Sequence, residues 1–262
     1  MPSCLRAVLR VAALSCALIA TASAEEARVA VAANFLETLR SLAEEFERTS
    51  DHRVEVTPGS TGLLVAQIRN GAPFDVLLAA DDVRPAALVR DGFSANVNVS
   101  DDSPVVFTYA VGRLALWSAT PGRIDESTLD DLSGESFRWL AIAESRTAPY
   151  GAAAREVLEQ LGVWQALQSR IVRGHNVAQT FAMIQTGNAE LGFVALSQAL
   201  AWEGGSSWTT VPDSLHEPIA QDAVLLKRGE TNPAARAFFS WLRSATAGQL
   251  IESRGYSVPD SP

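Results

Sequence analysis

The sequence has very few cysteines and histidines. Its two cysteines, Cys4 and Cys16, both lie within the first 24 residues, so a chain cleaved after residue 24 has none. That excludes disulfides, thiol chemistry and thiolate metal ligands. The three histidines, His52, His175 and His216, do not have the spacing of a metal site. We therefore expect no direct metal ligands and no cofactor.

The first 24 residues have the composition of a cleavable signal peptide. Arg6 and Arg10 form a positively charged start, an apolar run over 11–21 follows, and small residues at 22–24 provide a cleavage site. The apolar run is too short to span a membrane. We predict that residues 1–24 are a signal peptide and that the remaining chain is periplasmic.

Positive charge is also scarce. The chain has 21 Lys and Arg against 30 Asp and Glu, and loss of the signal peptide changes the formal net charge from −9 to −11. Such an acidic surface argues against binding to nucleic acid or to anionic membranes. It would repel an anionic ligand at long range, but salt screens that field beyond about 8–10 Å. An oxyanion would therefore have to be held by local dipoles.

The chain has no low-complexity segment, heptad run or sequence repeat, and strand-like and helix-like stretches alternate. Helical spacing of apolar residues is clear over 36–48, and a buried strand is expected over 74–78. Alternation of this kind predicts an α/β protein in which mostly parallel sheets are flanked by helices. The roughly 240 residues that follow the signal peptide suffice for one large or two modest domains.

Two long β-rich runs, 105–117 and 219–227, suggest a division into lobes. The first is too long for an average strand, so we expect it to pass between two lobes and the second to cross back. The predicted units are lobe one at 25–105 plus 218–262 and lobe two at 106–217. A ligand cleft would then lie between them, as in a two-lobed periplasmic-binding-protein fold.

The stretch 57–62 has the residues of an anion-binding turn. It lies between a β-like run and a helical pattern, its glycines Gly59 and Gly62 permit a tight turn, and Ser60 and Thr61 are typical helix caps. A helix N-terminus exposes unpaired N–H groups and attracts anions. For this loop alone, an ordinary capped helix is the simpler interpretation.

Three further loops, at 32–35, 144–151 and 174–177, also connect strands to helices. In open α/β sheets ligands bind beyond the carboxyl ends of the strands, where such loops meet. The four loops contain a single Lys or Arg, which is Arg146, beside Glu144. Phosphoryl transfer requires a metal or a basic clamp, so these loops indicate binding by neutral donors. They also offer little to accept the proton of hydrogen phosphate.

Seven stretches of the chain together match one family. They are 32–35, 59–62, 66–76, 79–81, 107–112, 148–151 and 191–196. Through them the chain resembles the periplasmic molybdate-binding proteins of ABC importers, a branch of the two-lobed solute-binding proteins. The runs Gly-Ala-Pro-Phe-Asp-Val at 71–76 and Ala-Pro-Tyr-Gly at 148–151 are the most specific, and the resemblance covers the chain beyond the signal peptide.

The resemblance implies a molybdate or tungstate ligand, delivered to a membrane permease by a monomeric receptor. It implies a set of oxyanion-binding positions: Ala33, Asn34, Ser60, Tyr150 and Val177. By this comparison, Asn34 and Ser60 supply backbone and side-chain donors, Val177 its N–H, and Tyr150 its hydroxyl or its N–H. Molybdenum would thus be held only as the oxyanion.

The chain departs from the family pattern at two positions. Ala33 stands where close relatives carry a hydroxyl residue, and Phe193 stands where another branch carries a ligand tyrosine, which Tyr150 replaces. Interpretations without a ligand remain for two of the positions: Asn34 as a plain helix cap, and Tyr150 packed against a neighbouring helix.

Three other functions remain open. The ligand could be another tetrahedral oxyanion, such as sulfate or phosphate. A secreted serine hydrolase would use Ser60 as nucleophile, but Pro58 occupies the first glycine position of the nucleophile-elbow pattern and no base is evident. The ligand domain of a regulator is disfavoured by the signal peptide and by the lack of a DNA-binding segment. We therefore expect a receptor and not an enzyme.

Overall fold

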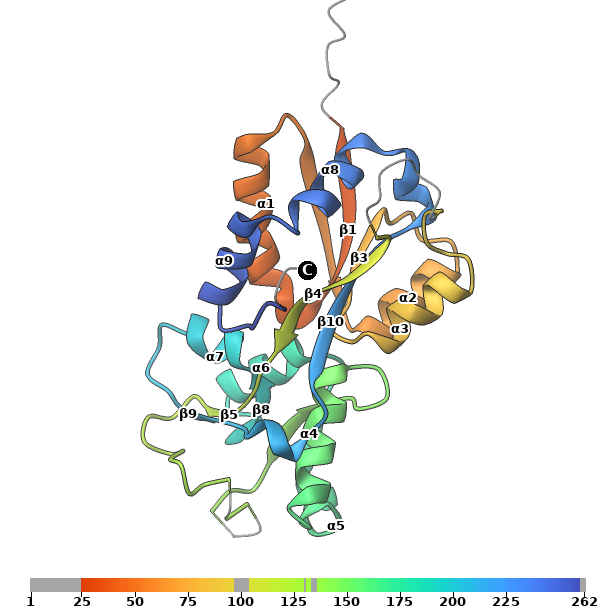
Figure 1. The fold of residues 1–262 in the computed structure, drawn as a ribbon. Coiled ribbons are helices and arrows are strands. Elements are labelled where there is room, and N and C mark those ends of the chain that lie inside the picture. Colours follow the sequence, from red (N-terminus) through yellow and green to blue (C-terminus); the bar gives the residue numbers. More distant parts are fainter. Residues whose placement is uncertain (1–24, 97–103, 130, 133–135, 260–262) are drawn as a thin grey trace, which may run out of the picture.

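The computed structural model describes residues 25–96, 104–129, 131–132 and 136–259. The predicted signal peptide lies outside them. The described chain forms two lobes, each built on a five-stranded sheet with helices on its faces (Figure 1). No helix in the described ranges is both long and apolar enough to cross a membrane.

Lobe one contains the sheet β2-β1-β3-β10-β4. Its strands are β1 (Glu26–Ala32), β2 (Arg53–Gly59), β3 (Val76–Leu78), β4 (Val106–Gly112) and β10 (Ile219–Leu225). Its helices are η1 (Ala33–Phe35), α1 (Leu36–Thr49), α2 (Thr61–Arg69), α3 (Val83–Arg90), η4 (Lys227–Thr231), α8 (Pro233–Trp241) and α9 (Ala245–Ser253).

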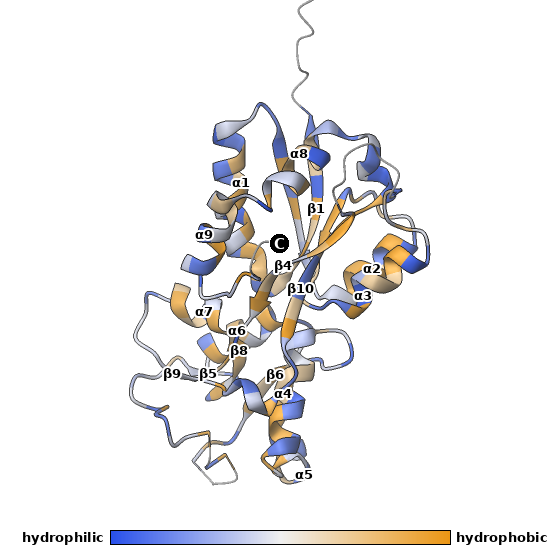
Figure 2. Ribbon diagram, in the orientation of Figure 1, coloured by the Kyte–Doolittle hydropathy of each residue, from blue (hydrophilic) through white to orange (hydrophobic). Residues whose placement is uncertain are grey.

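Alternate residues of the central strands pack against different helices. Val29 and Val31 of β1 lie in one core with α1, α8 and α9, whereas Ala30 lies in another with α2 and α3. Because successive strand side chains point to opposite faces, both faces of this sheet are covered. The amphipathic pattern of α1 is visible in Figure 2, with Leu39 and Leu42 buried and Arg48 exposed.

Lobe two contains the sheet β7-β6-β8-β5-β9. Its strands are β5 (Leu114–Ser118), β6 (Leu140–Ala143), β7 (Ile171–Gly174), β8 (Leu191–Ala195) and β9 (Ser207–Thr210). Its helices are α4 (Pro149–Gln160), α5 (Trp164–Leu167), η2 (Gln168–Arg170), α6 (Val177–Gln185), α7 (Leu196–Ala201) and η3 (Asp213–Leu215).

Both sheets are mixed. In lobe one β10 runs antiparallel to its neighbours β3 and β4, and in lobe two β5 runs antiparallel to β8 and β9. The remaining strands of each sheet share one direction, as expected for βα units. The sequence patterns did not predict β9 or α7, because both are too short to establish a clear period.

The chain passes between the lobes where the sequence indicated. The run 105–117 forms β4 in the first sheet and β5 in the second, with Arg113 between them. The return lies at the start of β10, whose first residue, Ile219, also packs in the core of lobe two. The first change of sheet thus falls at Arg113, and the division of the chain into lobe one at 25–105 plus 218–262 and lobe two at 106–217 stays a prediction.

Candidate ligand-binding site

The four predicted loops meet at one small cavity between the lobes. Lobe one contributes the starts of η1 and α2, and lobe two the starts of α4 and α6. All five predicted residues line it; the lining consists of Ala32, Ala33, Asn34, Gly59, Ser60, Thr61, Ala80, Ala148, Pro149, Tyr150, Asn176 and Val177. The volume of this cavity, about 10 Å³, is far below the several hundred Å³ of a pocket that binds an organic ligand. The site therefore suits a small inorganic group.

Ser60 presents an unpaired hydroxyl to this cavity. It is 3% exposed, and its Oγ has no hydrogen-bond partner among the described residues. The alternative interpretation of an ordinary side-chain cap does not hold: Ser60 occupies the N-cap position of α2 without a cap hydrogen bond, and the Oγ1 of Thr61 accepts from the N–H of Ala80. An unpaired buried hydroxyl costs about 1–3 kcal/mol, so this donor is available to a ligand.

Main-chain N–H groups add further donors. The first N–H groups of a helix have no acceptor within it. Asn176 caps α6 by accepting from the N–H of Gln179, which leaves the N–H of Val177 at the cavity. Neither that N–H nor those of Ser60 and Tyr150 form hydrogen bonds with another described residue. Both lobes thus direct unpaired donors at one point.

The side chain of Asn34 lies in a buried polar network and not at a helix cap. Ala32 is the N-cap of η1, so the interpretation of Asn34 as a plain cap is wrong. The side-chain Nδ2 of Asn34 donates to the Oε1 of Gln221 at 3.0 Å and to the hydroxyl of Tyr256 at 3.2 Å. The main-chain carbonyl oxygen of Asn34 accepts from the hydroxyl of Tyr256 at 2.8 Å. Both N–H bonds of the amide are therefore already used.

Tyr150 joins the same network from the other lobe. The Nε2 of Gln221 donates to its hydroxyl at 3.3 Å. Burial raises the pKa of Tyr150 well above its ordinary value, and the neighbouring Tyr256 adds to the shift. The hydroxyls of Tyr150 and Tyr256 are therefore neutral near pH 7 and carry no charge that would repel an anion.

Sequence reasoning missed Gln221 and Tyr256. Gln221 is fully buried in β10, and Tyr256 lies in the segment after α9. The one available signal is the polar pair Gln221-Asp222 within an otherwise apolar run. That signal does not say which residues the pair contacts, because its partners are far away in the chain.

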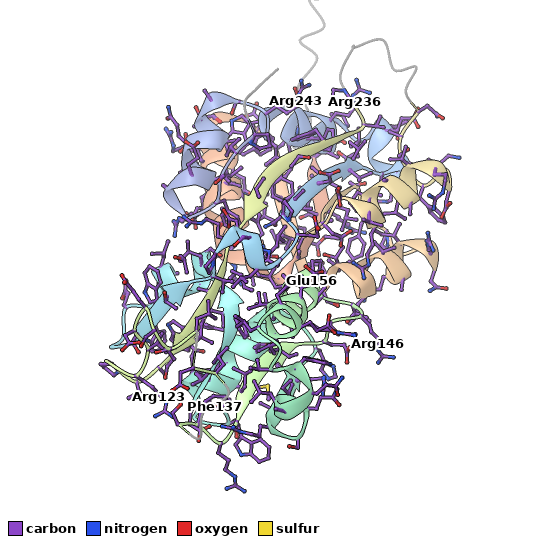
Figure 3. All side chains as sticks on the ribbon, turned by 60° about the horizontal axis from the view of Figure 1, so that its bottom comes forward. Arg123, Phe137, Arg146, Glu156, Arg236 and Arg243 are labelled. Atoms are coloured by element: carbon purple, nitrogen blue, oxygen red, sulfur yellow. The ribbon has the colours of Figure 1, made fainter. Side chains whose placement is uncertain are left out.

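The residues that line the cavity carry no charge. The Nη2 of Arg84 in lobe one donates to the carbonyl oxygen of Arg146 in lobe two at 2.8 Å. The side chain of Arg146 is 85% exposed, pairs with Glu144, and points away from the ribbon (Figure 3). The donors inside are therefore neutral, as the loop compositions predicted.

The geometry gives no support to a Ser60 nucleophile. All three histidines lie in the described ranges and none lines the cavity. His175 is next to the cap of α6 but exposed. Phe193 is buried in the core of lobe two and does not line the cavity either. Within the described ranges, no group of three His, Cys, Asp or Glu residues could hold a metal ion.

Two lobes, a crossing at Arg113 and a donor-lined cavity between them define a two-lobed binding protein for a small ligand. The chain belongs to the bacterial extracellular solute-binding protein family, whose profile matches residues 27–257.

Its similarity to individual members covers nearly the whole chain. The molybdate-binding protein ModA of Azotobacter vinelandii is 46% identical over 95% of this chain and 96% of that protein. The ModA of Rhodobacter capsulatus is 43% identical over 97% of each. The solved periplasmic molybdate-binding protein of Azotobacter vinelandii superposes with a TM-score of 0.80 at 38% identity, covering 89% of this chain and 100% of that one.

Proposed function

We propose that this protein captures molybdate, and also tungstate, in the periplasm and delivers it to the membrane permease of an ABC importer. The observation that carries the proposal is the buried, unpaired hydroxyl of Ser60 in a small uncharged cavity at the starts of four helices. Two relatives named as molybdate-binding proteins, more than 40% identical over almost their full length, support the choice of ligand.

The chemistry of the cavity suits a tetrahedral oxyanion that carries no proton. Helix N-termini bear partial positive charge and unpaired N–H groups, so they stabilise an anion without a cation. We assign the N–H groups of Ser60, Tyr150 and Val177 and the hydroxyl of Ser60 to this role, with Ala33 and Asn34 contributing main-chain groups at the start of η1. No carboxylate lines the cavity to accept a proton.

The proposal includes a receptor without catalytic activity. The family and its closely matching members support transport, and Ser60 has no described base within hydrogen-bonding distance. We further propose that the protein is exported, loses residues 1–24, functions as a monomer and does not bind nucleic acid, in keeping with its acidic charge.

A calorimetric titration of the purified chain with molybdate, tungstate, sulfate and phosphate tests the function. We expect tight binding of one molybdate or tungstate per chain and much weaker binding of the other two anions. Equal affinity for sulfate would instead indicate a general oxyanion receptor. Absence of heat with all four anions, in a protein shown to be folded, would refute the proposal.

A further inference from the structure

The hydroxyl of Tyr150 reaches from lobe two into lobe one. Tyr150 is in the first turn of α4, whereas Gln221, which donates to the hydroxyl, is on β10. The hydroxyl lies directly over Gly112, the last residue of β4. A Cβ atom placed on Gly112 would overlap with both the Tyr150 hydroxyl and the Nε2 of Gln221. Gly112 therefore provides the space in which these two groups meet.

The amide of Gln221 is held in one orientation. Its side chain is fully buried, and its Oε1 accepts from the Nδ2 of Asn34 and from the hydroxyl of Tyr109, each at 3.0 Å. With its oxygen used in this way, the Nε2 is directed at Tyr150. Rotating the amide would place its nitrogen against the Nδ2 of Asn34, which can only donate, and this is unfavourable in a buried site.

The network returns to lobe two at its other end. The hydroxyl of Tyr256 donates to the carbonyl oxygen of Asn34 and lies 2.8 Å from the Oγ of Ser197 in α7. The polar chain therefore starts in lobe two at Ser197, crosses lobe one and ends in lobe two at Tyr150. Each of its two crossings exists only while the lobes are together.

We propose that Tyr150 has two separate roles: its N–H binds the oxyanion, while its hydroxyl is a closure contact that Gln221, a positioning residue, holds over Gly112. This inference rests on the proposed function for the first role only. In this inference the hydroxyl of Tyr150 holds the two lobes together and does not bind the ligand. The sequence left open whether the hydroxyl or the N–H of Tyr150 binds the ligand.

The two assignments predict different kinetics. A closure contact stabilises the closed state whichever ligand is bound. Tyr150→Phe should therefore release molybdate about 2- to 12-fold faster, which is the ratio that corresponds to the free energy of one neutral hydrogen bond. Capture should keep its rate, and the ratio of molybdate to sulfate affinity should not change. A hydroxyl bound directly to the anion would contribute more, roughly 10- to 150-fold, and its loss would alter that ratio.

Two further variants isolate the contact. Gly112→Ala removes no polar group but fills the space under the hydroxyl, so it should mimic Tyr150→Phe. Gly248→Ala is the matched control, because a Cβ there meets nothing closer than 4.0 Å. In a Gln221→Leu background, Tyr150→Phe should have little further effect, since the contact is already lost.

Lobe separation gives a readout that is independent of affinity. Residues 25–262 contain no cysteine, so the exposed positions Glu44 and Gln160, one in each lobe, accept spin labels after Glu44→Cys and Gln160→Cys substitution. Pulsed electron resonance then measures the distance between lobes with and without saturating molybdate. We expect longer or broader distances in Tyr150→Phe and Gly112→Ala, and the parental distribution in Gly248→Ala.

The possible failures are distinguishable. Absence of molybdate binding in the parental protein would refute the proposed function, and the distance measurement without anion would still test the contact. Parental distances in both Tyr150→Phe and Gly112→Ala, or a changed molybdate-to-sulfate ratio in Tyr150→Phe, would overturn the assignment of the hydroxyl. Should Gly112→Ala fail to fold, Tyr150→Phe alone decides the outcome.

Discussion

The main-chain N–H of Gly62 in lobe one donates a 3.0 Å hydrogen bond to the carbonyl oxygen of Thr147 in lobe two. A Cβ on Gly62 would lie 3.1 Å from the backbone of Thr147. The turn that the sequence suggested does not need this glycine, because neither Gly59 nor Gly62 has a positive φ. Gly62 is required by the close approach of the other lobe.

Gly62→Ala should therefore weaken ligand binding by hindering closure. Overpacking by a methyl group costs about 1–3 kcal/mol, and since the lobes can separate to relieve it, we expect the lower end, roughly a fivefold loss of affinity. Calorimetry measures the loss, and small-angle scattering should show a larger radius of gyration for the molybdate complex. Parental values for both quantities would contradict a closure role for this contact.

The sequence was sufficient to predict the four loops and the residues they bring together. Capping residues and apolar periods are local signals, so they locate strand ends and helix starts such as those at Ser60 and Val177. The network behind the cavity is not local: Asn34 pairs with residues 187 and 222 positions away. No short-range pattern specifies such partners. Capping and ligand binding favour the same residue types, so the loop alone did not distinguish these two roles for Ser60.

Ser60→Ala should affect binding and stability in opposite directions. Loss of a hydrogen bond to a charged ligand costs about 1.5–3 kcal/mol, or roughly ten- to 150-fold in affinity. The ligand-free protein should unfold at the same or a higher temperature, because the variant removes an unpaired buried hydroxyl.

Thr61→Val is the matched control for Ser60→Ala. It leaves the N–H of Ala80 without its acceptor and should lower the unfolding temperature while changing affinity much less. Calorimetric titration and thermal unfolding of both variants provide the comparison. Unchanged affinity in Ser60→Ala would show that its hydroxyl is not a ligand donor.

Ala33→Thr tests the departure of this chain from its relatives. Ala33 lines the cavity and is nearly fully buried. A hydroxyl at this position would therefore lie beside the ligand and could donate a hydrogen bond to it. We expect molybdate affinity to be kept or increased in a folded variant. Titration against Ala33→Val, which has similar bulk without the hydroxyl, separates donation from packing. Severe weakening by Thr alone would mean that this wall of the cavity is misassigned.

The tyrosines of the network predict a loss of stability at alkaline pH. Burial raises the pKa of Tyr256 from its ordinary value of 10 to about 12. Because the folded-state pKa exceeds the unfolded one, the contribution to stability is fully present below pH 10 and is lost as the pH rises to about 12. This difference corresponds to roughly 3 kcal/mol. The unfolding temperatures of the parental protein and of Tyr256→Phe should therefore converge as the pH is raised from 8 to 12. A constant difference between the two temperatures would contradict a raised pKa of Tyr256 in the folded protein.

Selectivity between oxyanions should follow the size of the cage and not the charge. Sulfate and molybdate are both tetrahedral dianions, so charge cannot separate them. Donors at the starts of packed helices are fixed in position, and the longer metal–oxygen bonds of molybdate and tungstate reach donors that sulfate leaves unpaired. Each unpaired donor costs about 1–3 kcal/mol, so two give roughly a hundredfold or more.

Phosphate has a second disadvantage, since its proton finds no carboxylate among the residues that line the cavity. Thermal unfolding measures the result directly: an anion at a hundred times its dissociation constant stabilises the folded protein by about 2.7 kcal/mol. Molybdate and tungstate should reach this level at concentrations where sulfate and phosphate have little effect. Equal stabilisation by sulfate would refute a size-matched cage, because rigid donors set for the larger anion cannot all pair with the smaller one.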